Sequence, residues 1–221
     1  MNVVLRRAAW WAEDYAYAAV WQARAFASRV EPESFLSGTG TPIVVLPGIY
    51  ETWKFMQPLA MRVHELGHPV HVLDALHRNL QPVAEMADGV AAYLVAHSLQ
   101  DVVLLAHSKG GLAGKLAMLG AESERIRGMV AVATPFGGSR YARLMLPRNL
   151  RALSPCDPSI VSLSAQHEVN ARIVSVYARF DPHIPEGSEI PGAKNVPLDT
   201  GGHFRVLAHP RVMAEVTALA A

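Results

Sequence analysis

A serine at the junction of an apolar segment and a helical segment constrains this chain more than any other feature. Residues 101–105 predict a strand buried on both faces of a parallel sheet, and residues 109–119 carry apolar side chains at helical spacing. Ser108 lies between the two segments, and the residues two positions before and after it, Ala106 and Gly110, are small. A sharp turn from strand to helix requires small residues at these positions, and it exposes the serine hydroxyl beside free amide groups. The stretch therefore predicts a catalytic serine, with an ordinary small-residue turn as the alternative.

The order of the remaining segments predicts an α/β architecture. Strand-like runs alternate with helical patterns, which favours right-handed crossovers and a mostly parallel sheet of roughly six strands with helices on both faces. The predicted strands are 41–46, 69–74, 101–105, 128–133, 172–178 and 194–198. A chain of 221 residues can bury a sizeable core, so we expect a single domain over residues 1–221. Residues 140–170 are longer than a simple connection and predict a small cap.

The composition narrows the classes of partner and cofactor. Charged residues make up 18% of the chain and the formal net charge is +1, so there is no electrostatic reason to expect a nucleic-acid partner. The single Cys156 excludes an internal disulfide, and we expect it to be a packed and inert thiol. His64, His68 and His71 suggest a metal site, but a glycine and a proline between them break the helix that would align them. We therefore expect no metal.

The first thirty residues, 1–30, predict a long amphipathic N-terminal helix. Its aromatic and small side chains form two stripes, one with Trp10, Tyr17 and Trp21 and the other with Trp11, Tyr15, Ala18 and Phe26. Glu13 and Asp14 interrupt the apolar stretch, which argues against a secretion signal, and no apolar run reaches the ~18 residues of a spanning helix. These features predict a cytoplasmic protein. We expect the helix to pack on the body of the domain, with a homodimer contact or a peripheral lipid contact as alternatives.

An acid and a base follow two later strands. Asp181 comes after the strand 172–178, and His203 comes after the strand 194–198. Serine, acid and histidine in this chain order, each at the carboxyl end of a strand, predict a catalytic triad. In that interpretation His203 takes the proton of Ser108, while Asp181 orients the imidazole and stabilises its charged form.

Other carboxylates and histidines remain as alternatives for these two roles. The competing acids are Asp157 and Asp199, and the competing bases are His183 and His209. Neither of these histidines has the pair of glycines that precedes His203 and would let it swing inward. We expect His107, next to the serine, to point away from the site.

Backbone amide groups complete the predicted chemistry. A loop beginning Pro47-Gly48 follows an early strand, so we assign the oxyanion donors to the N–H groups of Ile49 or Tyr50 and of Lys109. The predicted substrate-binding residues are aromatic or apolar, with core packing as an equal alternative: Tyr50, Trp53, Phe55, Met56 and Phe136.

Residues 106–111, Ala-His-Ser-Lys-Gly-Gly, are similar to the A-H-S-x-G-G motif of compact bacterial lipases. Further blocks resemble this family in the same order, at 46–48, 134–139, 180–185 and 202–204. The resemblance covers residue 43 to the C-terminus and implies an α/β-hydrolase fold that cleaves carboxylic esters, of small molecules or lipids, through an acyl-enzyme without a cofactor. Lys109, where the family commonly has an apolar residue, and the N-terminal helix are departures from its pattern.

Two other functional hypotheses remain as alternatives. An acyltransferase or a thioesterase would employ the same triad with a different acceptor or a different acyl bond. A non-catalytic binding protein on a hydrolase scaffold is the third interpretation, and the complete set of Ser108, Asp181 and His203 argues against it.

Overall fold

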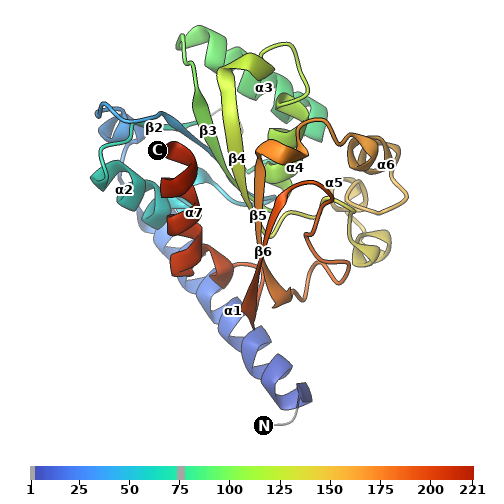
Figure 1. The fold of residues 1–221 in the computed structure, drawn as a ribbon. Coiled ribbons are helices and arrows are strands. Elements are labelled where there is room, and N and C mark those ends of the chain that lie inside the picture. Colours follow the sequence, from blue (N-terminus) through green and yellow to red (C-terminus); the bar gives the residue numbers. More distant parts are fainter. Residues whose placement is uncertain (1–2, 74–77) are drawn as a thin grey trace.

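The computed structural model describes residues 3–73 and 78–221, in which a central sheet lies between two layers of helices (Figure 1). The described strands are β1 (Ile43–Leu46), β2 (Val70–Val72), β3 (Val102–His107), β4 (Ile126–Val132), β5 (Ile173–Phe180) and β6 (Lys194–Gly201). Their order across the sheet is β2-β1-β3-β4-β5-β6, and each neighbouring pair is parallel. The predicted α/β class is confirmed. Asp74, the last residue of the predicted strand 69–74, lies outside the described residues.

Helices cover both faces of this sheet. The described helices are α1 (Val3–Ala27), α2 (Gln57–Glu65), α3 (Val83–Ala96), α4 (Lys109–Ala117), α5 (Arg148–Arg151), α6 (Pro158–Ala165) and α7 (Pro210–Ala220). Short 3-10 turns precede several of them, among them η2 (Trp53–Phe55), η5 (Arg140–Leu144) and η7 (Arg205–Ala208). None of the helices in the described ranges is both long and apolar enough to cross a membrane.

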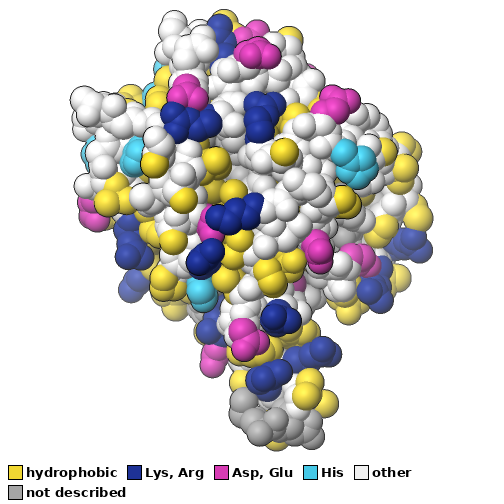
Figure 2. Space-filling view, in the orientation of Figure 1, with side chains coloured by type: hydrophobic (Ala, Val, Ile, Leu, Met, Phe, Trp, Pro, Cys, Tyr) yellow, Lys and Arg dark blue, Asp and Glu magenta, His cyan; other side chains and the backbone are white. Residues whose placement is uncertain are grey.

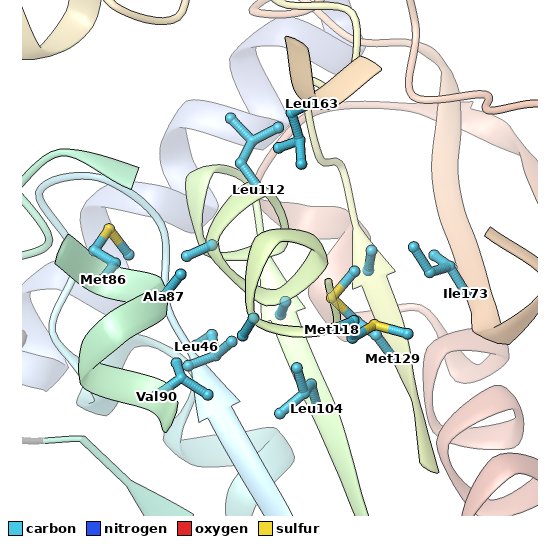
Figure 3. Close-up of a cluster of buried hydrophobic side chains, with 14 of the residues drawn as sticks. Leu46, Met86, Ala87, Val90, Leu104, Leu112, Met118, Met129, Leu163 and Ile173 are labelled. Atoms are coloured by element: carbon cyan, nitrogen blue, oxygen red, sulfur yellow. The ribbon is translucent and has the colours of Figure 1, made fainter. Parts of the chain in front are cut away.

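Strands β1, β2 and β3 are buried along their whole length because both faces of the sheet are covered there. In β1, Val44 and Leu46 face the cluster formed with α3, α4 and α6, while Ile43 and Val45 face the cluster formed with α2 and α7. Figure 3 shows the first cluster, where Leu46, Leu104 and Met129 from three strands meet the side chains of α3 and α4. The central strands are thus packed on both faces: the cluster with α3, α4 and α6 is the first core, and the cluster with α2 and α7 is the second core.

Leu104 at the centre of β3 provides a direct test of this packing. It is fully buried in the first cluster, and alanine there would leave a cavity. We expect Leu104→Ala to lower the free energy of unfolding by about 2–5 kcal/mol. Urea denaturation measures the change, and Leu146→Ala is the matched control because Leu146 is 89% exposed. A loss from the core variant as small as the loss from the control would contradict the packing.

The N-terminal helix α1 packs on the body of the domain mainly along one of its predicted stripes, although Ala18 of the other stripe also contacts the core. It contacts η2, β6 and η7, and Tyr17 and Trp21 pack against the second core. Trp11, Tyr15 and Phe26 from the other stripe remain exposed. Figure 1 shows the N-terminal end of α1 projecting beyond the sheet, and Figure 2 shows basic and hydrophobic side chains together on that end. A dimer or lipid contact through this helix stays a prediction.

Candidate active site

Ser108 occupies a strained turn between β3 and α4. Its φ and ψ are 50° and −122°, a conformation that non-glycine residues rarely adopt. The backbone of β1 lies so close that a Cβ at Gly110 would be 2.1 Å from the Leu46 carbonyl oxygen. Ala106, on the other side of the serine, is fully buried in β3. Steric crowding therefore explains the small residues around the serine, as expected for a strand-to-helix turn that presents a hydroxyl.

The structure brings Ser108, His203 and Asp181 together at the carboxyl edge of the sheet. Ser108 Oγ is 3.0 Å from His203 Nε2, and His203 Nδ1 is 2.8 Å from Asp181 Oδ2. The other carboxylate oxygen of Asp181 accepts hydrogen bonds from the amides of His183 (2.7 Å) and Ile184 (3.1 Å). The acid is therefore fixed by its own loop, and it fixes the imidazole in turn. This arrangement can move a proton from the serine hydroxyl to the histidine.

Burial and neighbouring charges shift the pKa values of His203 and Asp181 in opposite directions. Burial lowers the pKa of His203, but the Asp181 carboxylate outweighs it by charge and by hydrogen bond, with smaller contributions from Glu51 and Asp14, so that the pKa is raised overall. Burial raises the pKa of Asp181, and His203, together with the His183 amide, lowers it further than burial raises it. The pair is therefore electrostatically set to stabilise an imidazolium beside a carboxylate.

Two amide groups near Ser108 are available to bind an oxyanion. Lys109 is the first residue of α4, and amides in a first helical turn have no partner within the helix. Ile49 lines the same pocket as Ser108, and its amide donates no hydrogen bond within the described ranges. The amide of Tyr50, predicted as an alternative donor, instead donates to the Arg78 carbonyl at 2.7 Å. The geometry thus favours Ile49 over Tyr50.

Lys109 holds the loop that carries Ile49. Its buried Nζ donates to the carbonyl oxygens of Asn79 (2.8 Å) and Gln81. Asn79 Nδ2 in turn donates to the carbonyl oxygens of Pro47 (2.9 Å) and Gly48 (3.0 Å). Burial lowers the pKa of Lys109 to about 8. Lys109 therefore connects the start of α4 to the loop of Asn79, and Asn79 connects it to the loop of Pro47 and Gly48. Residue spacing alone gives no means to predict this link.

His107 does not point away from the site, contrary to our expectation. It is fully buried, its Nδ1 is 2.8 Å from Glu51 Oε2, and its Nε2 is 3.2 Å from the backbone oxygen of His203. Glu51 Oε2 also accepts a hydrogen bond from the Gly48 amide at 2.7 Å. The cause of the difference is that the loop of His203 lies against the last residue of β3, and its buried carbonyl group needs a donor.

A pocket of about 470 Å³ lies beside Ser108 and His203. Its wall includes Tyr15 and Gln22 of α1, Ile49 and Tyr50 after β1, and Tyr141 and Leu150 of the predicted cap. Of the predicted cap at residues 140–170, the part with η5 and α5 thus lies along the pocket, whereas Ile160 and Leu163 of α6 belong to the core. The volume falls in the usual range of small-molecule pockets, about 300–1,000 Å³.

Most of the residues predicted to bind substrate lie outside this pocket. Tyr50 lines it, whereas Trp53, Phe55, Met56 and Phe136 are at most 5% exposed and belong to the two cores. Phe55 and Met56 border a smaller pocket of about 90 Å³ beside α1. Aromatic spacing after a strand is the same for core and pocket residues, so the sequence pattern did not separate them.

The competing acids have structural roles elsewhere. Asp157 caps α6 by accepting the Ser159 amide at 3.0 Å, and Asp199 lies on an exposed strand face 3.9 Å from Arg179. Cys156 is exposed, in contrast to the packed thiol that we expected, because the connection before α6 lies on the surface.

The competing bases have other partners as well. His209 caps α7 by accepting the Arg211 amide at 3.1 Å. His183 lies in the pocket wall with Nε2 3.1 Å from the Tyr15 hydroxyl, and burial, followed by the charge of His203, lowers its pKa to about 4. Among the residues described, no group of three or more His, Cys, Asp or Glu side chains could hold a metal ion.

Solved structures similar to this chain identify its fold. No family model matches the chain. Lysosomal thioesterase PPT2 of Bos taurus is 24% identical over 122 residues, which cover 50% of this chain and only 40% of that relative. The structure is similar to MGS-MChE2, an alpha/beta hydrolase from a lagoon-sediment metagenome (TM-score 0.59, 19% identity, 82% of this chain and 90% of the other). It is also similar to mature Bacillus licheniformis lipase BlEst2 (TM-score 0.62, 16% identity, 82% and 93%). The chain has the α/β-hydrolase fold.

Proposed function

We propose that this protein is a serine hydrolase that cleaves acyl esters through an acyl-enzyme on Ser108. The observation that carries the proposal is the hydrogen-bonded series Ser108, His203 and Asp181 in the wall of a substrate-sized pocket. A serine beside a base, with the base oriented by a third group, is the arrangement that makes a hydroxyl nucleophilic. The fold similarity to a lipase and an alpha/beta hydrolase supports the same class of reaction.

The reaction divides into two steps on these residues. As Ser108 Oγ attacks the carbonyl carbon of the ester, His203 Nε2 takes its proton, and the amides of Ile49 and Lys109 stabilise the oxyanion. The tetrahedral intermediate then collapses, the bond to the alcohol breaks, and His203 returns the proton to the leaving oxygen. Water attacks the acyl-enzyme in the same way and releases the carboxylic acid.

The chemistry of the pocket indicates an uncharged acyl group. Among its described lining residues there is no lysine or arginine, and the one carboxylate apart from the site residues, Glu51, is already bonded to Gly48 and His107. The remaining wall is mainly apolar or tyrosine, for example Tyr141, Met145 and Leu153. Such a wall binds hydrocarbon chains better than charged ones.

A thioesterase is the second candidate, because the chain is similar over half of its length to a lysosomal thioesterase. The same triad would cleave a thioester, with a thiolate as the leaving group. Matched p-nitrophenyl esters and acyl thioesters, from two to sixteen carbons, separate the two hypotheses by the ratio of their kcat/KM values. Labelling of Ser108 by a fluorophosphonate, read by peptide mass, tests the nucleophile independently of substrate choice.

Four outcomes decide between the hypotheses. Faster cleavage of esters supports the proposal, and faster cleavage of thioesters favours the second candidate. Transfer of the acyl group to an added alcohol at a rate above hydrolysis would indicate an acyltransferase. Absence of both turnover and fluorophosphonate labelling in the folded protein would leave only a binding role.

A further inference from the structure

The buried carboxylate of Asp14 on α1 lies directly against the loop that carries His203. Asp14 is fully buried. One of its oxygens accepts a hydrogen bond from the His203 amide at 2.9 Å, and the other accepts from the amides of Phe204 and Arg205, both at 2.8 Å. No ion pair to Asp14 occurs among the residues described. Three amides therefore compensate the cost of burying this charge, and all three come from one loop.

The sequence of this loop is adapted to the close approach of α1. A Cβ at Gly201 would lie 2.5 Å from Trp10 Cε3, and a Cβ at Gly202 would lie 2.5 Å from Asp14 Oδ1. Gly202 also has a φ of +127°, which other residues rarely adopt. The glycine pair before His203 is thus explained by contact with the helix as well as by the turn itself.

The peptide groups of His203 are held from two sides. The N–H points to Asp14 at 2.9 Å, and the C=O lies 3.2 Å from His107 Nε2. With the main chain fixed at both groups, the imidazole reaches Asp181 and Ser108 from one defined position. Reacting groups need such fixed geometry, because a displacement of about 1 Å can cost about 100-fold in rate.

We propose that Asp14 is a positioning residue of the active site, which makes the N-terminal helix a working part of the hydrolase. The carboxylate fixes the main chain of His203, and its negative charge favours the imidazolium that forms when Ser108 loses its proton. The inference rests on the proposed function, because it assigns Asp14 a part in that reaction.

The charge of Asp14 affects the pKa of His203, which a purely structural role of Asp14 would leave unchanged. The groups that face or surround the His203 ring are Asp181 and His183 after β5, Glu51 after β1, His107 on β3, and Asp14 on α1. Asp181, Glu51 and Asp14 raise the pKa of His203, against burial, which lowers it. Removing the charge of Asp14 therefore lowers this pKa, and the acidic limb of kcat/KM against pH moves to lower pH.

The experiment compares Asp14→Asn with wild type across the pH range on a p-nitrophenyl ester. We expect kcat to fall about 10- to 100-fold, KM to change less than about 2-fold, and the acidic limb to move to lower pH. Glu13→Gln is the control on the same helix, because Glu13 is exposed and pairs with the side chain of Arg205, away from the main chain of His203. Glu215→Gln is the control for lost stability, because Glu215 is a buried carboxylate of α7, paired with Lys194 and Arg211.

The outcomes separate this inference from the proposed function. Unchanged kcat and an unmoved limb in Asp14→Asn, with an active wild type, would overturn the role of Asp14 alone. A loss of kcat without movement of the limb, matched by Glu215→Gln at equal loss of stability, would overturn it as well. A wild type that neither turns over esters nor reacts with a fluorophosphonate would overturn both proposals.

Hydrogen exchange covers the case in which Asp14→Asn does not fold. In the wild-type protein, the amides of residues 203–205 should exchange slowly, although they lie at the end of a loop, because Asp14 accepts all three. Exchange of these amides as fast as that of exposed loops would overturn the inference.

Discussion

Ser108→Ala should lower kcat for ester hydrolysis by about 10⁴- to 10⁶-fold, the largest loss expected from any single substitution in this chain. The variant keeps His203 and the oxyanion amides, but it has no atom that can form the acyl-enzyme. The residual rate then depends on water reaching the bound carbonyl group. Hydrolysis of p-nitrophenyl esters, normalised to the concentration of folded protein, measures the effect.

The control for this variant is a second buried serine. Ser175 on β5 donates a hydrogen bond to the Ser188 carbonyl at 2.6 Å and does not line the pocket. We expect Ser175→Ala to keep wild-type kcat at temperatures where it is folded. A Ser108→Ala variant that retains more than about one per cent of wild-type kcat would show that another group is the nucleophile.

The fold and the three central residues could be predicted because each depends on local pattern. Continuous apolar runs indicate strands buried on both faces, and the turn around Ser108 needs small neighbours for steric reasons that act within a few residues. Asp181 and His203 follow from their chain order after two later strands. The carboxyl ends of parallel strands meet at one edge, so order along the chain was enough to bring these residues together.

The residues that support the triad could not be predicted, because their partners are distant in sequence. Asp14 bonds to residues about 190 positions away, and in the sequence it reads as a charge that merely interrupts an apolar helix. Glu51 and Asn79 likewise reach distant partners, since Glu51 bonds to His107, 56 positions away, and Asn79 bonds to the Pro47 carbonyl, 32 positions away. One sequence feature could have indicated the role of Asp14: it lies on the same stripe as Trp10, Tyr17 and Trp21. A charge on a helix face that packs against the protein must find hydrogen-bond donors.

Asp181→Asn should lower kcat by about 10⁴-fold, because the amide no longer holds His203 in the productive tautomer. An asparagine that turns its NH₂ group to His203 Nδ1 forces the ring proton to Nε2, where it faces Ser108 and blocks proton transfer. The amide also no longer stabilises the imidazolium that forms in the transition state. Steady-state kinetics on the same ester as for Ser108→Ala measures the loss.

The pH dependence of the remaining activity gives an independent check on Asp181. Hydrolysis requires neutral His203, and Asp181 raises the pKa of that histidine, so wild-type kcat/KM falls as pH drops through the raised value. Without the charge the pKa falls, and the acidic limb of Asp181→Asn must move to lower pH, in the same direction as for Asp14→Asn and further, because Asp181 contributes more. Asp157→Asn and Asp199→Asn are the matched controls, since these carboxylates lie at a helix cap and on an exposed strand. Equal losses in all three variants would mean that Asp181 is not the acid of the triad.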